Sequence, residues 1–134
     1  MRRPAVLADL ERLIALRDAA GAEALSDPAL VGDADLRRLI AAGSVIVWDE
    51  SGQIAGFAAI DGATIHLLVD PAQRSKGIGR DLLTAACTAL KQAGRDAATL
   101  NLAPGSIATR HYLAAGWVVA GETAPGGIIL KKPL

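Results

Sequence analysis

The sequence predicts an α/β (α+β) fold, in which one mixed, mostly antiparallel sheet is flanked by about four helices. Two segments of helical periodicity open the chain. Three β-rich runs follow, and then come a strand, a long amphipathic helix and another strand. A strand–helix–strand unit of this kind joins two parallel neighbours of one sheet by a crossover. With 134 residues, the chain is expected to form a single domain over 1–134.

The first two predicted elements are helices. Apolar residues recur at helical spacing over 7–20, with charged residues between them, and Gly21 ends the pattern. A second, shorter helix has Asp33 or Asp35 as its N-cap, since a carboxylate accepts hydrogen bonds from the free amides of a helix start. Gly43 ends this helix, because glycine readily adopts the left-handed conformation found just after a helix.

Three β-rich runs then alternate with turn signals. Asp61-Gly62 predicts a two-residue hairpin turn between the second and third runs, because both residues tolerate positive φ. All three runs are apolar at both alternations, so we expect both faces of the sheet to be covered. The predicted strands are 45–48, 54–60 and 64–69.

The second half of the chain begins with the predicted crossover helix. Apolar residues at helical spacing indicate a helix over 78–93, which Gly94 ends. The remaining predicted elements are a strand over 97–102, a helix over about 106–115, and two strands over 117–120 and 128–131 on either side of Pro125-Gly126-Gly127.

Composition and charge argue against several classes of protein. Fourteen basic and fourteen acidic residues cancel, so a broad basic surface for nucleic acid or acidic membrane is not expected. No segment approaches the roughly 18 consecutive apolar residues of a membrane-spanning helix. The single cysteine, Cys87, forms no internal disulfide, and its apolar helical surroundings predict a core residue with no catalytic role. We therefore expect a cytoplasmic protein with neither nucleic acid nor membrane as partner.

The join between the third β-rich run and the long helix has the composition of an anion-binding site. The first amides of a helix lack internal partners and carry the positive end of its dipole, so they attract anions such as a pyrophosphate. Glycine lets a phosphate approach the backbone, and three cationic side chains add positive charge at the same place. The residues of this join are Arg74-Ser75-Lys76-Gly77-Ile78-Gly79-Arg80.

A Gly-x-Gly triplet alone does not define a site. With 14 glycines in 134 residues, about one such triplet arises by chance, and a structural loop is the alternative interpretation. The preceding strand, the following helix and the cations favour phosphate binding. Two other phosphate motifs fit less well. The dinucleotide fingerprint requires glycine where Leu82 stands, and the lysine–hydroxyl pair of the Walker A motif is absent.

Two spaced motifs make the chain resemble the GCN5-related N-acetyltransferase (GNAT) family. The family signature Arg/Gln-x-x-Gly-x-Gly/Ala corresponds to 74–79, which Val69-Asp70-Pro71 precedes and Leu82-Leu83 follows. A second family segment, Ala-x-x-x-Tyr-x-x-x-Gly-Phe, corresponds to 108–117, with Trp117 in place of phenylalanine. The resemblance extends over essentially the whole chain, with both motifs in the family's order.

The resemblance implies that acetyl-CoA is the cosubstrate and that no metal is required. It implies that the strands before and after the long helix splay apart, so that the crossover forms a cleft for the pantetheine arm. Amides at the helix start then hold the pyrophosphate. Relatives often carry an asparagine where this chain has Gly105, and the next residue is either a coenzyme A contact or a helix cap. The cofactor-binding residues that the resemblance implies are Leu67, Leu68, Val69, Arg74, Ser75, Lys76, Gly77, Ile78, Gly79, Arg80, Ser106 and Ala108.

The reaction that the resemblance implies needs no enzyme nucleophile, because an acetyl thioester is activated and a neutral amine attacks it directly. The amine must lose a proton, the oxyanion needs a donor, and the leaving thiolate needs a proton. The resemblance makes a backbone amide among Leu67 to Val69 the oxyanion donor and Tyr112 the catalytic acid. The alternative for Tyr112 is a packing role with its hydroxyl bonded to a carbonyl group.

The general base is the least defined part of this hypothesis. Many relatives carry a glutamate on the strand before the phosphate turn, whereas 63–69 contains no carboxylate. His66 is the titratable side chain of that run and is the candidate catalytic base or water relay, with a structural histidine as the alternative. A base acting through ordered water, or an amine that arrives deprotonated, stays open. His111 lies about 100° around the helix from Tyr112, so we expect it to face elsewhere.

The sequence therefore predicts an acetyl-CoA-dependent N-acetyltransferase that acts on a primary amine of a small molecule or peptide. The alternatives are a non-catalytic acyl-CoA-binding or regulatory domain on the same fold and, third, a general nucleotide-phosphate binder. The acceptor site is expected from 25–43 and 122–127, where no charge cluster identifies the acceptor. The resemblance is also compatible with a homodimer, which is common in the family.

Overall fold

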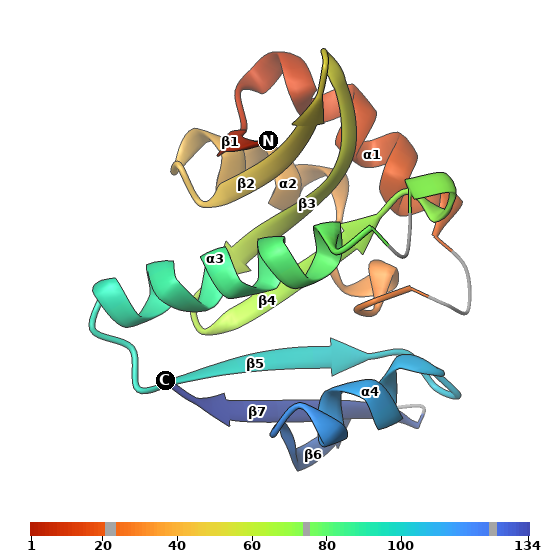
Figure 1. Cartoon of the computed structure of the whole chain (residues 1–134), viewed down its shortest axis with the longest axis vertical. Coiled ribbons are helices and arrows are strands. Elements are labelled where there is room, and N and C mark those ends of the chain that lie inside the picture. The colour runs from red at the N-terminus through yellow and green to blue at the C-terminus, as the bar shows by residue number, and fades with distance from the viewer. Residues whose placement is uncertain (21–23, 74–75, 124–125) are drawn as a thin grey trace.

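A computed structural model shows one mixed sheet with helices on both of its faces (Figure 1). It describes residues 1–20, 24–73, 76–123 and 126–134. Within these ranges the sheet has seven strands in the order β1-β2-β3-β4-β5-β7-β6. The strands are β1 (Arg2–Pro4), β2 (Val45–Glu50), β3 (Gln53–Asp61), β4 (Thr64–Val69), β5 (Ala97–Leu102), β6 (Val118–Thr123) and β7 (Gly127–Pro133). The α-helices are α1 (Leu10–Ala19), α2 (Asp33–Ala41), α3 (Ile78–Gln92) and α4 (Ala108–Ala114), and the short 3-10 helices are η1 (Leu7–Asp9), η2 (Pro28–Leu30) and η3 (Pro71–Gln73).

Strands β4 and β5 are parallel neighbours, whereas the other described strand pairs are antiparallel. Helix α3 connects β4 to β5, so the predicted crossover and the mixed, mostly antiparallel sheet are confirmed. The pairing of β4 with β5 is limited to Thr64 opposite Thr99. Beyond that pair the two strands diverge, as Figure 1 shows. The space between their diverging ends, bordered by 65–69 of β4 and 100–102 of β5, is here named the split.

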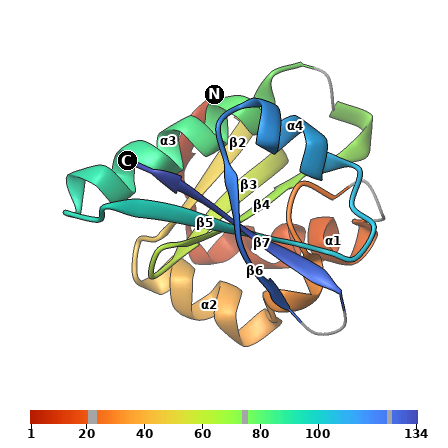
Figure 2. The same ribbon diagram turned by 90° about the horizontal axis from the view of Figure 1, so that it is seen from below.

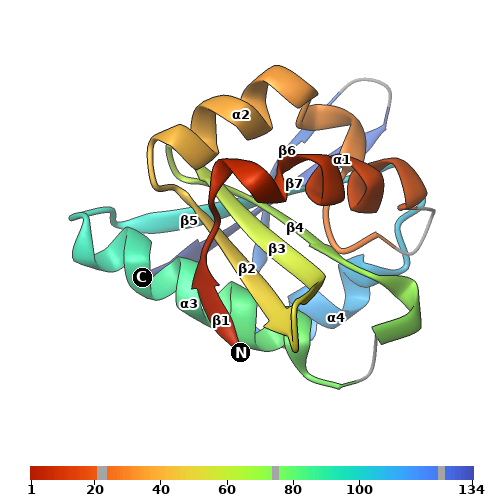
Figure 3. The ribbon, with the colours of Figure 1, turned by 90° about the horizontal axis from the view of Figure 1, so that it is seen from above.

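The helices form two layers, with α3 and α4 on one face of the sheet and α1 and α2 on the other (Figure 2). Neighbouring side chains of β4 enter different cores. Leu67 packs in the core that contains Leu82 of α3, whereas Leu68 packs in the core that contains Leu13 of α1 and Leu36 of α2. Both faces of the sheet are therefore covered at β3 and β4, which confirms the expectation for these apolar strands, whereas β6 is mostly exposed. Figure 3 shows the same layers from the side of β1, which borders β2 at one edge of the sheet.

Strand β1 was not expected from the sequence. Arg3 lies opposite Val47 in the β1–β2 ladder, and the Ala5 N–H group donates to the Val45 carbonyl at 2.9 Å. A three-residue edge strand that ends in Pro4 is too short to show an alternating pattern, so the sequence contains no signal for it. None of the helices in the described part of the chain is long and apolar enough to cross a membrane.

Two local predictions were displaced by one to a few residues. Asp61 pairs with Thr64, so the hairpin turn is Gly62-Ala63 rather than Asp61-Gly62. The N-cap of α2 is Gly32, and Asp35 accepts its N–H group at 2.9 Å from inside the first turn. In both cases the predicted residue lies at the turn or the helix start, but the element begins or ends at a neighbouring residue. The expected helix stop Gly21 and the loop residue Pro125 lie outside the described residues.

Candidate active site

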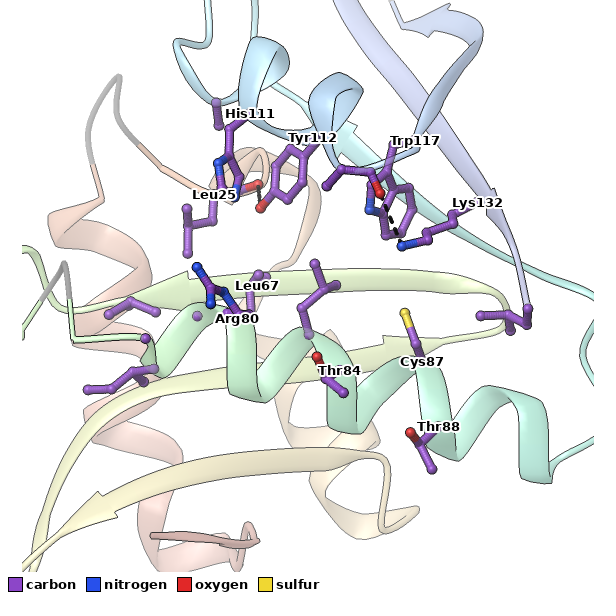
Figure 4. Close-up of a pocket in the computed structure, with 18 of the residues that line it drawn as sticks. Leu25, Leu67, Arg80, Thr84, Cys87, Thr88, His111, Tyr112, Trp117 and Lys132 are labelled. Atoms are coloured by element: carbon purple, nitrogen blue, oxygen red, sulfur yellow. Dashed lines mark hydrogen bonds between the residues drawn. The ribbon is translucent and has the colours of Figure 1, made fainter.

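A cleft of about 870 Å³ lies between α3 and α4, over the split (Figure 4). Leu67 and Val69 of β4 contribute to its lining, and Leu25 contributes from the segment before η2. The volume is in the range of about 300–1,000 Å³ that is usual for small-molecule and cofactor sites. The helical walls are Ile78, Gly79, Arg80, Leu83, Thr84, Cys87, Thr88 and Lys91 on one side, with Ile107, Ala108, His111, Tyr112 and Ala115 on the other.

The start of α3 lies at one end of this cleft. Gly77 is the N-cap at φ +80°, a conformation that strains any residue with a side chain, and no described side chain caps the helix. Asp81 N–H donates to the Gly77 carbonyl at 3.0 Å, so the amides of Ile78, Gly79 and Arg80 have no partner within the helix. These three residues line the cleft. The arrangement is that of an anion-binding helix N-terminus.

The two glycines of the motif have different physical roles. Gly77 supplies the left-handed conformation described above, and an added Cβ there would meet nothing within 4 Å. At Gly79 an added Cβ would lie 2.8 Å from Cδ1 of Leu25. The second glycine therefore lets the segment that contains Leu25 pack against the helix start. We expected both glycines to serve phosphate approach, and the structure adds this packing requirement.

The described charges at the helix start are mainly positive. Arg80 is exposed and lines the cleft, and Lys76 is exposed with its Nζ donating to Gln73 Oε1 at 2.8 Å. The acidic residue of the first turn, Asp81, forms an ion pair with Arg2 at 2.6 Å, which reduces its repulsion of an incoming anion. Two predicted contacts, Arg74 and Ser75, lie outside the described residues.

Strand β4 presents alternate residues to the cleft. Leu67 and Val69 line it, whereas Leu68 packs in the core on the opposite face and lies opposite Phe57 in the β3–β4 ladder. Leu67 N–H donates to Ser26 Oγ at 2.8 Å and so points away from β3, toward the split. Because amides alternate along a strand, Val69 N–H points the same way. Of the three predicted β4 contacts, the structure brings Leu67 and Val69 to the cleft.

Tyr112 is buried in the wall of the cleft, with 2% of its surface exposed. Its hydroxyl donates to the Leu25 carbonyl at 2.9 Å, which is the contact that the packing alternative anticipates. Its ring meets Trp117 edge-on at a centroid distance of 6.1 Å and His111 at 5.7 Å (Figure 4). Tyr112 thus lies in the cleft wall with its hydroxyl held by a backbone carbonyl.

His66 belongs to the other face of β4. It lies opposite Ala59, a residue of the core beneath α1 and α2, and it does not belong to the lining of the cleft. Burial lowers the pKa of His66 below its ordinary value, and the carboxylates of Asp61 and Asp35 partly offset this effect. The imidazole is therefore neutral at neutral pH, the form that a base requires, but the sheet stands between it and the cleft.

The predicted residues around α4 also differ in whether they line the cleft. Ala108 lines the cleft, whereas Ser106 lies outside its lining and its Oγ accepts the Ala108 N–H at 3.2 Å, just before the N-cap residue Ile107. His111 was expected to face away from Tyr112. That expectation is wrong, because His111 and Tyr112 both line the cleft.

Several residues of the cleft were missed by sequence reasoning. Cys87 was expected in the core, but it is half-buried and lines the cleft, and burial raises the pKa of its thiol. Lys132 Nζ donates to the Ala115 carbonyl at 3.2 Å across the wall that contains Trp117. A polar stripe at helical spacing was the available signal for the cleft-facing side of α3. Its members are Arg80, Thr84, Cys87 and Lys91.

Among the described residues there is no group of three or more histidine, cysteine, aspartate or glutamate side chains that could hold a metal ion.

Solved structures of acetyltransferases share this fold over nearly their whole length. The PaiA N-acetyltransferase from Thermoplasma acidophilum, in complex with coenzyme A, is 19% identical, with a TM-score of 0.75 over 100% of this chain and 98% of that one. A ribosomal-protein-alanine N-acetyltransferase from Brucella melitensis is 21% identical, with a TM-score of 0.76 over 100% and 99%. An N-acetyltransferase from Staphylococcus aureus Mu50 is 19% identical, with a TM-score of 0.75 over 99% and 97%. The chain thus shares the fold of these three proteins.

A family model for the acetyltransferase (GNAT) domain matches residues 18–128. This range includes the start of α3, the edge of β4 and the tyrosine of α4. The chain therefore belongs to the GNAT acetyltransferase family, and its class is that of the N-acetyltransferases. A comparison with curated protein sequences finds no significant match.

Proposed function

We propose that this chain, acting as a single domain, transfers the acetyl group of acetyl-CoA to a primary amine of a small molecule or peptide. One observation carries the proposal: the uncapped start of α3 lies beside the split, and Tyr112 lies in the facing wall of the same cleft. The structure of the similar protein from Thermoplasma acidophilum is a complex with coenzyme A, which supports a cosubstrate of this type.

In this proposal the backbone holds most of the cosubstrate. The amides of 78–80 bind the pyrophosphate, with the guanidinium of Arg80 adding charge, because a helix N-terminus binds anions through unpaired N–H groups and its dipole. The predicted contacts at 74–76 complete this group. The pantetheine arm enters the split along the edge of β4, and Ala108 gives its facing wall a small side chain.

The proposed reaction is a direct displacement at the thioester carbonyl. The amine nitrogen attacks the carbonyl carbon, a C–N bond forms, and the C–S bond breaks to release the coenzyme A thiolate. The oxyanion accepts a hydrogen bond from the split-facing amide of Val69, because the other amide on that edge of β4, that of Leu67, already donates to Ser26 Oγ. The Tyr112 O–H turns from the Leu25 carbonyl to the thiolate, gives it the phenolic proton, and regains a proton from solvent.

The remaining proton is that of the attacking amine. All of β4 is described, and it carries no carboxylate. His66, its titratable side chain, is the candidate base, and its position on the far face favours transfer through ordered water over direct contact. An amine that arrives neutral needs no base at all.

The test is coenzyme A thiol release from acetyl-CoA with a panel of primary amines, comparing the parent with Tyr112→Phe. We expect turnover with at least one amine. The variant should lower kcat about 100-fold with little change in the KM for acetyl-CoA, since phenylalanine keeps the ring packing and removes the proton donor. Coenzyme A affinity, measured by calorimetry, is the control for folding and should be equal in both proteins.

One result would contradict the proposed activity, and another would contradict only the role of Tyr112. Coenzyme A binding without turnover on any amine would indicate a non-catalytic acyl-CoA-binding domain. An undiminished kcat in Tyr112→Phe would leave acetyl transfer standing but remove Tyr112 from the mechanism.

A further inference from the structure

The tripeptide Leu25-Ser26-Asp27 contacts three elements around the split. Ser26 Oγ accepts the Leu67 N–H at 2.8 Å and donates to the Leu67 carbonyl at 3.2 Å, so it is bonded to the edge of β4 that faces the split. Asp27 N–H donates to the Asn101 carbonyl of β5 at 2.7 Å. The Leu25 carbonyl accepts the hydroxyl of Tyr112 from α4 at 2.9 Å. We call this tripeptide the bridge.

The bridge links the two strands where they no longer pair with each other. The β4–β5 ladder is limited to Thr64 opposite Thr99, and Leu67 and Asn101 lie further along the diverging strands. Adjacent residues of the bridge are bonded to these two positions. The separation of β4 and β5 at the split is therefore set by the length of one dipeptide rather than by ladder hydrogen bonds.

Ser26 supplies the side-chain contact that attaches the bridge to β4. Its hydroxyl is buried, with 2% of the residue exposed, and it satisfies both the donor and the acceptor of Leu67. The bridge contacts of its two neighbours to β5 and α4 are made by their backbone. A buried hydroxyl that pairs two backbone groups fixes its own peptide in place, because moving it leaves those groups without partners.

We propose that Ser26 is a positioning residue for Tyr112. By attaching the bridge to the edge of β4, Ser26 fixes the Leu25 carbonyl, and that carbonyl orients the phenol of Tyr112 beside the split. The expected effect of Ser26 on kcat rests on the proposed acetyl transfer. The expected effect on the position of the Tyr112 ring does not.

The structural test uses the fact that Tyr112 is the single tyrosine of the chain. Protein labelled with 3-fluorotyrosine gives one ¹⁹F resonance, which reports the surroundings of this ring. Ser26→Ala should shift or broaden that resonance, whereas Ser26→Thr, which keeps the hydroxyl, should retain it. Thr64→Val is the matched control, since it removes a hydroxyl that also joins β4 to β5 but at the other end of the pair. A resonance that is unchanged in Ser26→Ala, or displaced equally by Thr64→Val, would overturn the proposal.

The kinetic test is a double-mutant cycle with Tyr112→Phe, using acetyl-CoA and the best amine of the panel. Ser26→Ala should lower kcat about five- to tenfold in the parent, the equivalent of one misplaced hydrogen bond, and have little further effect when Tyr112 is already phenylalanine. Ser26→Thr should restore the parent value. Equal losses in both backgrounds would show that Ser26 acts independently of Tyr112.

If Ser26→Ala does not fold, Ser26→Cys keeps the branching of the side chain and weakens the hydrogen bonds, and the same ¹⁹F comparison applies to it. A parent protein without turnover would contradict the proposed function and leave the ¹⁹F result to decide the role of Ser26. Turnover by the parent together with an unchanged ¹⁹F resonance in Ser26→Ala would reject the role of Ser26 and leave the proposed function standing.

Discussion

The two ends of the β4–β5 pair are held together in different ways. At the closed end, Thr64 and Thr99 are opposite each other in the ladder, and their hydroxyl groups hydrogen-bond at 2.9 Å. At the open end the strands are joined through a third segment, by Ser26 on β4 and Asp27 on β5. Contacts at the closed end belong to the two strands alone, so their loss should affect stability. Contacts at the open end also border the cleft, so their loss should affect function.

The two ends of α3 offer the same contrast with closely matched residues. Gly77 precedes the helix at φ +80°, and Gly94 follows it at φ +85°. An added Cβ would meet nothing within 4 Å at either position. A substitution therefore introduces similar backbone strain at both ends, but only the first glycine lies in the cleft lining.

The largest expected effect in this comparison is that of Gly77→Ala on coenzyme A binding. A residue with a side chain is disfavoured in the left-handed conformation by about 1–2 kcal/mol, so the helix start should rearrange and redirect its free amides. We expect the Kd for coenzyme A, measured by calorimetry, to rise about tenfold.

Gly94→Ala is the matched control for that prediction. It should lower the free energy of unfolding by about 1 kcal/mol, measured by urea denaturation, and leave the coenzyme A affinity unchanged. Equal losses of affinity in both variants would show that strain in α3, rather than the geometry of its start, controls binding.

The start of α3 could be predicted from the sequence because its requirements are local. Glycines, free amides and nearby cations are all properties of consecutive residues, as in the segment from Gly77 to Arg80, although the left-handed conformation of Gly77 became known only from the structure. The covered sheet and the crossover could be predicted for the same reason, since the spacing of apolar residues within each segment indicates a strand or a helix.

The bridge could not be predicted, because its contacts join distant parts of the chain. Ser26 and Leu67 are brought together only by the diverging strands, and nothing in the pattern around Ser26-Asp27-Pro28 indicates a partner on β4. The same holds for Cys87, whose apolar neighbours predict burial whether the helix faces a core or a cleft. Local sequence thus indicated the half of the site that we propose binds an anion, and tertiary contacts defined the half that we propose orients the phenol.

A smaller effect is expected at the closed end, from Thr64→Val. The change removes the hydrogen bond to the Thr99 hydroxyl and keeps a β-branched side chain, so the free energy of unfolding should fall by about 1 kcal/mol. Coenzyme A affinity and kcat should stay at the parent values. A loss of affinity without a loss of stability would mean that the closed end also shapes the cleft, and the distinction between the two ends would fail.

The smallest expected effect concerns the two faces of β4 and is tested by His66→Gln. Burial lowers the folded-state pKa of His66 below its ordinary value of 6.5, so below that pH the unfolded chain binds the proton more readily than the native protein. The stability contributed by the neutral imidazole is therefore complete above pH 6.5 and is lost as the pH falls toward the folded pKa. Urea denaturation at about pH 7.5 and about pH 5.5 should show a larger loss in the parent than in the variant.

The kcat–pH profile of His66→Gln tests whether the face of β4 that carries His66 takes part in the reaction. His66 lies outside the cleft lining, so His66→Gln should leave the shape of the kcat–pH profile unchanged if the amine loses its proton to water or arrives neutral. Loss of the acidic limb of that profile would instead identify His66 as the base that acts through ordered water. Ordered water would then transfer the proton from the cleft to His66 on the other face of the sheet. The residues around His66 beneath α1 and α2 would belong to the active site.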